Sequence, residues 1–196
     1  MSAYMKNRFA FLGIGRPELK ILERPFLAQL RKHPLDWSFV DACWGQEYRE
    51  AQYVALDYLA VKLKELTSDD LPRLKQLITT KSWWETVDTI DAYVGHLVAQ
   101  DSALEAEMLA WSQDDNLWLR RVAINHQLRF KEKTNVALLT KVIENNLGSD
   151  EFFINKAIGW SLREYSKTNP EWIRGFLSDH ESELSPLSLK EARKYL

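Results

Sequence analysis

Three segments of the sequence carry side chains that could together bind a flat or cationic ligand. Trp84 and Asp88 are four residues apart, so on a helix they lie on one face. Arg121 and Trp160 fall in two later segments. Tryptophan rings attract cations and stack on bases, and a carboxylate beside them favours positive charge. If the three segments lie side by side, the two indoles, the carboxylate and the guanidinium converge on one surface.

Basic side chains flank this set. Lys156 precedes Trp160 by four residues, and Arg163 follows it by three. Arginine and lysine both suit phosphate groups, the arginine through paired hydrogen bonds. The partner of Asp88 must come from another segment or from a ligand, because residues 82–119 contain no Lys or Arg.

A structural role explains the same residues without any chemistry. An aspartate and an arginine on neighbouring helices often form only an ion pair. A tryptophan in an all-helical protein usually packs in the core. Periodicity alone favours this structural interpretation over the chemical one. We expect Trp83, Trp111 and Trp118 to be core residues.

The charges are arranged in blocks along the chain, although the net charge is only −2. Residues 1–35 hold seven Lys or Arg against two Glu, and residues 117–168 hold nine against five acids. Basic flanks of this kind indicate a surface for a polyanion, with the acidic stretch held between them. For any single charge, an alternating solvated face is the simpler alternative.

Helices must position these side chains, because nearly every periodic segment has helical spacing. The main helices are predicted to start, at steps of 35, 34 and 35 residues, near Tyr48, Trp83, Leu117 and Phe152. Shorter helices are predicted over 71–79, 101–112, 134–146 and 185–196. A helix pair repeated about every 35 residues is typical of an α-solenoid, whose equivalent helices line one wall. The sequence therefore predicts an all-α fold of about ten helices without a sheet, as a single domain over 1–196.

Polar residues mark several of the predicted helix starts. A capping side chain accepts a hydrogen bond from one of the first free backbone N–H groups of a helix. The cluster at 68–70 is expected to cap the helix at Leu71, Ser82 the helix at Trp83, and a residue within 114–116 the helix at Leu117. Asp150 is expected to start the helix that follows it. Asn169 is expected to end one helix and to begin the next at Pro170.

The composition disfavours several classes of site. The single cysteine, Cys43, excludes an internal disulfide and a multi-cysteine metal site. The four histidines lack metal-ligand spacing, and there is no glycine-rich nucleotide motif and no Gly-x-Ser-x-Gly. No apolar stretch approaches the roughly 20 residues of a membrane span, and residues 1–15 have no signal-peptide pattern. We therefore expect a cytoplasmic monomer that uses neither metal nor cofactor.

Four blocks of the sequence carry a resemblance to a known family. They are spread over nearly the whole chain, at Tyr4–Ile14, Lys81–Asp88, Asp115–Arg121 and Phe152–Tyr165. These blocks resemble the AlkD family of DNA alkylation repair proteins, and the Lys-Ser-Trp-Trp…Asp block is specific. The resemblance implies a right-handed α-solenoid of HEAT-like helix pairs, with a basic concave groove for double-stranded DNA.

The resemblance also implies an activity. Members of the family excise N3- and N7-alkylated purines, which are cationic, without flipping the base into a pocket. The family's catalytic positions match Asp88, Trp84, Trp160 and Arg121. Asp88 would stabilise the sugar cation and position water, the indoles would contact the nucleotide, and Arg121 would hold a phosphate. The residues expected to bind DNA are Tyr4, Arg120, Arg121, Lys156 and Arg163.

One departure from the family pattern supports an alternative function. Family members carry another helix or two ahead of the block that starts here at Tyr4. Without that element the groove would lose one wall near the lesion. The alternative is therefore a non-catalytic relative that binds duplex or unusual DNA structures. A third hypothesis, a protein-binding scaffold, predicts no affinity for DNA.

Overall fold

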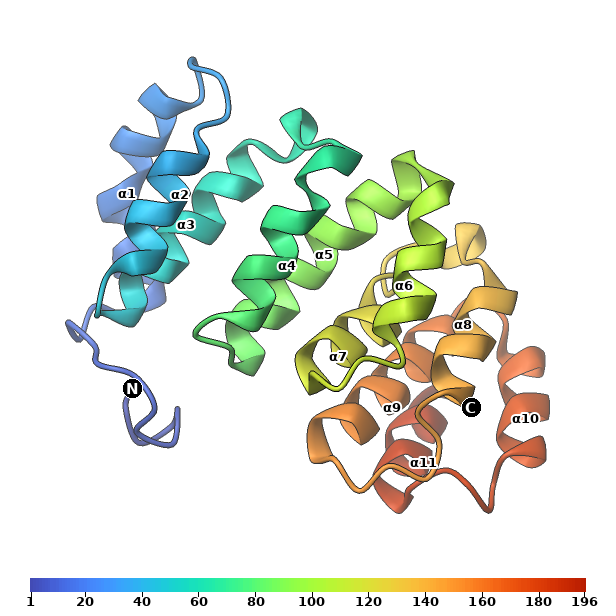
Figure 1. Cartoon of the computed structure of the whole chain (residues 1–196). Coiled ribbons are helices and arrows are strands. Elements are labelled where there is room, and N and C mark those ends of the chain that lie inside the picture. The colour runs from blue at the N-terminus through green and yellow to red at the C-terminus, as the bar shows by residue number, and fades with distance from the viewer. The chain divides into compact units, whose positions relative to one another are not determined.

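The computed structural model describes all residues, 1–196, and is entirely helical (Figure 1). Eleven α-helices are joined by loops and five short 3-10 helices, and no strand forms. The single isolated backbone bridge joins Ala10 to Tyr48. The predicted all-α class, the absence of a sheet and the expected number of helices are confirmed.

The chain divides into two compact units, Met1–Asp69 and Asp70–Leu196. The helices of the first unit are α1 (Arg16–Leu30), α2 (Trp37–Gly45) and α3 (Arg49–Val61), followed by the 3-10 turn η1 (Leu63–Glu65). Both α1 and α2 pack against α3. The 3-10 turn η2 (Ser68–Asp70) spans the boundary between the units. A single HEAT-like solenoid domain stays a prediction, because it concerns how the two units are joined.

The second unit contains eight α-helices. They are α4 (Leu71–Thr79), α5 (Trp84–Gln100), α6 (Glu105–Trp111), α7 (Leu117–Asn125), α8 (Val136–Glu144), α9 (Phe152–Ser166), α10 (Pro170–Asp179) and α11 (Pro186–Ala192). Three further 3-10 turns are η3 (Ser102–Leu104), η4 (Lys131–Lys133) and η5 (Arg193–Tyr195). Helix α5 packs against α7, α7 against α9, and α9 against α11. Helices that are equivalent in the 35-residue repeat are therefore neighbours within this unit.

Two of the five predicted caps are present. Asn116 Oδ1 accepts a hydrogen bond from the backbone N–H of Trp118 at 2.9 Å, and α7 begins at Leu117. Asn169 Oδ1 accepts from the N–H of Trp172 at 3.1 Å, and α10 begins at Pro170. The prediction for Ser82 is wrong, because its hydroxyl donates to the Ile78 carbonyl at 2.6 Å and so serves the end of the preceding helix. Asp70 precedes α4 and Glu151 precedes α9, and neither side chain accepts a capping hydrogen bond.

An aromatic cluster fixes the first turns of three equivalent helices. Trp83 precedes α5, Trp118 lies in the first turn of α7, and Phe153 in the first turn of α9. Their ring centroids are 4.9–5.8 Å apart. Aromatic pairs at this spacing add to the free energy of burial. The cluster sets the register of α5, α7 and α9, and with it the positions of side chains one turn further along.

The tryptophans expected in the core are there. Trp83, Trp111 and Trp118 are all buried. The adjoining apolar core of the second unit is built from α7 to α11, with Ile124, Ile158, Leu162 and Ile173 among its members. Burial of these side chains on one face of each helix leaves the opposite faces for polar groups.

In the first unit, a buried glutamate orders the N-terminal segment. The Glu50 carboxylate accepts hydrogen bonds of 3.0–3.2 Å from the backbone N–H groups of Leu12, Gly13 and Ile14. Gly13 has a φ of +91°, which a residue with a side chain rarely adopts. Tyr4, which precedes this anchored segment, is 70% exposed.

Candidate functional site

An aspartate and an arginine on neighbouring helices form the centre of the candidate site. Arg121 of α7 donates from Nε to Asp88 Oδ1 at 2.7 Å and from Nη2 to Asp88 Oδ2 at 2.8 Å. Its Nη1 donates to the Phe153 carbonyl, at the start of α9, at 2.6 Å. A guanidinium held through three nitrogens has a fixed orientation, and it fixes the carboxylate in turn.

The two partners differ in burial. The side chain of Arg121 is 1% exposed, whereas that of Asp88 is 20% exposed. The arginine therefore lies beneath the carboxylate, and Asp88 keeps an edge toward solvent. Arg121 was expected to hold a phosphate, but a guanidinium buried in this way presents almost no surface to DNA. Its two hydrogen bonds to Asp88 hold that carboxylate in one orientation.

Trp160 of α9 lies next to this pair. The Cζ of Arg121 is 5.1 Å from the centroid of the Trp160 ring. The Nζ of Lys156 is 5.7 Å from the same centroid, and the Cζ of Arg163 is 6.0 Å from it. Cations within about 6 Å of an indole face are attracted to its quadrupole. The half-buried ring thus has three cations of the protein around it.

The structure brings together three of the four residues proposed as catalytic: Asp88, Arg121 and Trp160. Trp84 lies on α5 one turn before Asp88, and it is half-buried. Among the residues expected to bind DNA, Arg120 is half-buried and its buried Nε has no hydrogen-bond partner. Tyr4 belongs to the first unit.

A glutamate that was not singled out from the sequence pairs with Lys156 and Arg163, the two other residues expected to bind DNA. Glu191 of α11 accepts from Lys156 Nζ at 2.6 Å and from Arg163 Nη1 at 2.7 Å. The hydrogen bond from Lys156 is the main reason why the pKa of Glu191 lies below its usual value. The repeat contained the signal, because Arg121, Lys156 and Glu191 follow one another at 35-residue steps.

A second buried carboxyl lies close to the pair. Asp91 is three residues after Asp88 on α5 and is 5% exposed. Burial raises the pKa of Asp91 well above its usual range, and the charge of Asp88 raises it further. Arg121 acts in the opposite direction. Burial and the charge of Asp88 thus both shift Asp91 toward its protonated form, relative to an exposed aspartate.

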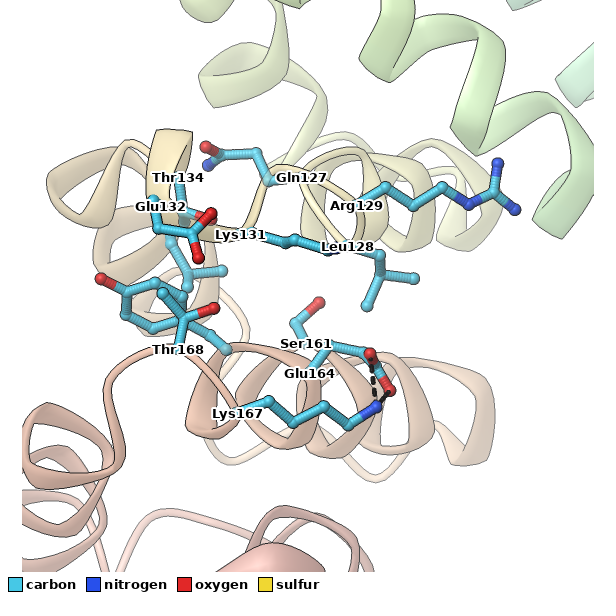
Figure 2. Close-up of a pocket in the computed structure, with 12 residues that line it drawn as sticks. Gln127, Leu128, Arg129, Lys131, Glu132, Thr134, Ser161, Glu164, Lys167 and Thr168 are labelled. Atoms are coloured by element: carbon cyan, nitrogen blue, oxygen red, sulfur yellow. Dashed lines mark hydrogen bonds and ion pairs between the residues drawn. The ribbon is translucent and has the colours of Figure 1, made fainter.

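The sequence did not predict the two hollows beside Trp160. A shallow one of about 220 Å³ is lined by Trp160, Arg163, Glu164, Arg129 and Leu128. A larger one, of about 580 Å³, shares the last three of these residues and lies between residues 127–134, which follow α7, and the second half of α9 (Figure 2). In Figure 2 the dashed lines mark Lys167, whose Nζ donates to both oxygens of Glu164 at 2.7 and 2.8 Å.

No three His, Cys, Asp or Glu side chains are grouped so that they could hold a metal ion. None of the helices combines the length and the apolar character that crossing a membrane requires.

Comparison with known proteins shows the protein family to which the chain belongs. The family described as DNA alkylation repair enzyme matches residues 1–196, and the chain belongs to this family. A solved structure, described as a predicted DNA alkylation repair enzyme from Enterococcus faecalis, is 40% identical to it. The alignment covers 100% of this chain and 92% of that one, with a TM-score of 0.92. Both findings support a role in DNA alkylation repair, with DNA as substrate or partner.

A more distant structure shares the fold. The crystal structure of smu.31 from Streptococcus mutans UA159 is 16% identical, with a TM-score of 0.64. The alignment covers 91% of this chain and 97% of that one. No protein with a curated description matches the chain.

Proposed function

We propose that the protein is a DNA N-glycosylase of the AlkD type, built as a HEAT-like repeat solenoid. It removes cationic N3- and N7-alkylated purines from double-stranded DNA, without base flipping and without metal or cofactor. The observation that carries the proposal is the Asp88 carboxylate, fixed from below by Arg121 and partly open to solvent beside Trp160.

The chemistry follows from the charge of the lesion. An alkylated purine is already positively charged, so it leaves with the electron pair of its glycosidic bond as a neutral base. The sugar becomes an oxocarbenium-like cation, which a fixed carboxylate stabilises. Asp88 also positions the water whose oxygen bonds to C1′, and the water's proton passes to solvent. Arg121 holds Asp88 in place throughout.

The tryptophans act on the cationic nucleotide. Trp84 lies one turn before Asp88 on α5, and Trp160 lies beside Arg121. An indole face attracts positive charge, and the attraction persists when charge moves from the base to the sugar. Both residues therefore support binding of the lesion and of the transition state.

The test is a base-release assay on methylated double-stranded DNA, run beside a DNA-binding titration on the same preparation. We expect free 3-methyladenine or 7-methylguanine to appear with the wild-type protein. We also expect DNA affinity to fall as salt rises, because phosphate contacts release counterions. Binding without base release refutes the glycosylase. Salt-independent or absent binding refutes every DNA-directed function.

One observation favours a non-catalytic DNA-binding function as the second candidate. Three cations of the protein already surround the Trp160 ring. They repel a cationic base and compete with it for the indole face. In that case the basic groups bind backbone phosphates, and methylated and unmethylated DNA bind with equal affinity.

A further inference from the structure

We propose that Glu191 of α11 is a positioning residue of this site, which holds Lys156 and Arg163 around Trp160 and so sets the ring against the nucleotide. The inference rests on the proposed function for its meaning in catalysis. Its geometric part, that Glu191 determines the surroundings of the Trp160 ring, is tested without DNA.

A single carboxylate bridges two turns of α9. Lys156 and Arg163 are seven residues apart, and Trp160 lies between them on the same helix. Glu191 Oε1 accepts a hydrogen bond from Lys156 Nζ at 2.6 Å, and Glu191 Oε2 accepts one from Arg163 Nη1 at 2.7 Å. Both cations are thereby kept 5.7 and 6.0 Å from the centroid of the indole.

The bridge depends on a close approach of α11 to α9. A Cβ at Gly159 would lie 2.6 Å from the Cβ of Glu191 and 3.1 Å from the Ser188 carbonyl oxygen. Only a glycine leaves that space. The Ser188 hydroxyl donates to the Asn155 carbonyl at 2.8 Å, which fixes α11 along α9. The contact presents Glu191 to both cations at once.

Loss of the carboxylate would release two like charges. Glu191 is 17% exposed, and its two partners are 26% and 20% exposed, so the cluster is partly shielded from water. Without it, Lys156 and Arg163 repel each other and turn toward solvent, and the indole loses two of its three cations. The freed cations are then available to DNA phosphates, which suit them.

The first experiment compares Glu191→Gln with the control Glu171→Gln. The control removes the same charge from α10, where Glu171 pairs with the exposed Arg174. The indole N–H resonance of Trp160 is followed by NMR in the DNA-free protein. The chain has 8 Trp, so the resonance is assigned by its loss in Trp160→Phe. We expect the chemical shift of this resonance to change in Glu191→Gln and to be unchanged in Glu171→Gln. An unmoved resonance in both overturns the inference.

The second experiment separates binding from chemistry. In Glu191→Gln we expect affinity for unmethylated DNA to be equal or up to about tenfold higher. Single-turnover base release should fall at least about tenfold, because the lost orientation of the Trp160 ring outweighs the removal of two cations that compete with the base for its face. Base release at the wild-type rate overturns the inference. If the wild-type protein releases no base, the proposed glycosylase fails, and the NMR comparison alone decides on Glu191.

Two further variants distinguish loss of the Glu191 bridge from a general loss of folding. Glu191→Asp keeps the charge but is one methylene shorter, so it cannot reach both cations. We expect it to keep the wild-type charge and to melt close to the wild-type temperature, while the Trp160 resonance shifts as it does in Glu191→Gln. Gly159→Ala displaces α11 and should shift the same resonance. If Gly159→Ala folds with that resonance unmoved, the bridge is not needed and the inference is wrong.

Discussion

Each unit of the molecule contains an arginine–aspartate pair that joins two packed helices. In the first unit Arg16 at the start of α1 pairs with Asp57 of α3, at 2.7 Å. In the second, Arg121 of α7 pairs with Asp88 of α5, also at 2.7 Å. Each arginine also lies near an aromatic ring, at 4.9 Å from the Tyr53 centroid and 5.1 Å from that of Trp160.

The two pairs differ in the exposure of the arginine, whereas the two aspartates are about equally exposed, at 19% for Asp57 and 20% for Asp88. Arg16 donates from a single nitrogen, Nη2, to both oxygens of Asp57, and its side chain is 38% exposed. Arg121 uses two nitrogens and is 1% exposed. In the second unit the arginine is buried, and the carboxylate that it holds keeps the same exposure as its counterpart in the first unit. An ion pair alone therefore does not identify a site; the site proposed at Asp88 rests on the buried arginine that fixes it and on Trp160 next to that arginine.

The largest expected difference between the pairs is in stability. Removing one partner of a buried ion pair costs about 3–5 kcal/mol, against about 0–1 kcal/mol for an exposed one. We expect Arg121→Ala to lower the free energy of unfolding by about 3–5 kcal/mol, and Arg16→Ala to lower it by about 0–1 kcal/mol. Urea unfolding followed by circular dichroism measures both. Equal losses would mean that the difference in burial has no energetic consequence.

The next difference concerns activity. Asp88→Asn should lower base release by about 10²–10³-fold, which is typical for loss of one electrostatic group in a transition state. Asp57→Asn, the matched change in the first unit, should leave it within about twofold. Because a carboxylate opposes the approach of phosphates, Asp88→Asn should keep or raise affinity for unmethylated DNA.

The same variants can also contradict the catalytic role of Asp88. If Asp88→Asn sharply weakens binding to unmethylated DNA, Asp88 serves mainly to order Arg121, and its catalytic role must be withdrawn. Undiminished base release in Asp88→Asn would remove Asp88 from the mechanism altogether. A melting curve for each variant shows whether the comparison is made between folded proteins.

A pH dependence of stability is expected in the first unit, because a buried acid lies beside the Arg16–Asp57 pair. Glu23 lies near Asp57, and burial, followed by its hydrogen bond to Asp57 and the charge of Asp57, raises the pKa of Glu23 to about 8. The folded state then binds a proton that the unfolded state releases near its ordinary pKa of 4.5. This contribution to stability is complete below about pH 4.5 and is lost as the pH rises through about 8.

The measurement is the free energy of unfolding of wild type and of Glu23→Gln from pH 5 to 9. The glutamine mimics the protonated acid, so the wild type should lose stability relative to the variant as the pH rises. Burial lowers the pKa of His126 to about 4, which gives stability an opposite slope below its ordinary 6.5. That slope cancels in the difference. A difference that does not change with pH would show that Glu23 titrates normally.

The helices of the second unit could be predicted because their signals are local. Apolar spacing and the turn residues placed α4 at 71–79, and the starts of α7 and α9 at Leu117 and Phe152, where the structure has them. The capping role of Ser82 was wrong because Ile78 carbonyl, one turn earlier, competes for the same hydroxyl. Nothing in a residue pattern decides between two such partners.

The pairing of Asp88 with Arg121 could be anticipated, because the repeat puts their helices side by side. The burial of Arg121 could not, since it depends on the Phe153 carbonyl and the packing of the aromatic cluster. Glu191 was missed for a similar reason. Its position in the repeat is visible, but the contact arises only because Gly159 lets α11 approach.

The smallest effect that we predict is on the salt dependence of DNA binding. Each phosphate neutralised by a basic side chain contributes about 0.9 to the slope of log K against log salt. Arg120→Ala should reduce the slope by about this amount, whereas Arg163→Ala should reduce it by less, because Glu191 already neutralises Arg163. Arg16→Ala should leave the slope unchanged, because its guanidinium is bound to Asp57. Titrations of unmethylated duplex at several salt concentrations give all three slopes. If Arg16→Ala flattens the slope as much as Arg120→Ala does, the pair in the first unit also contacts DNA. The contrast between the two pairs would then lie in their stability alone.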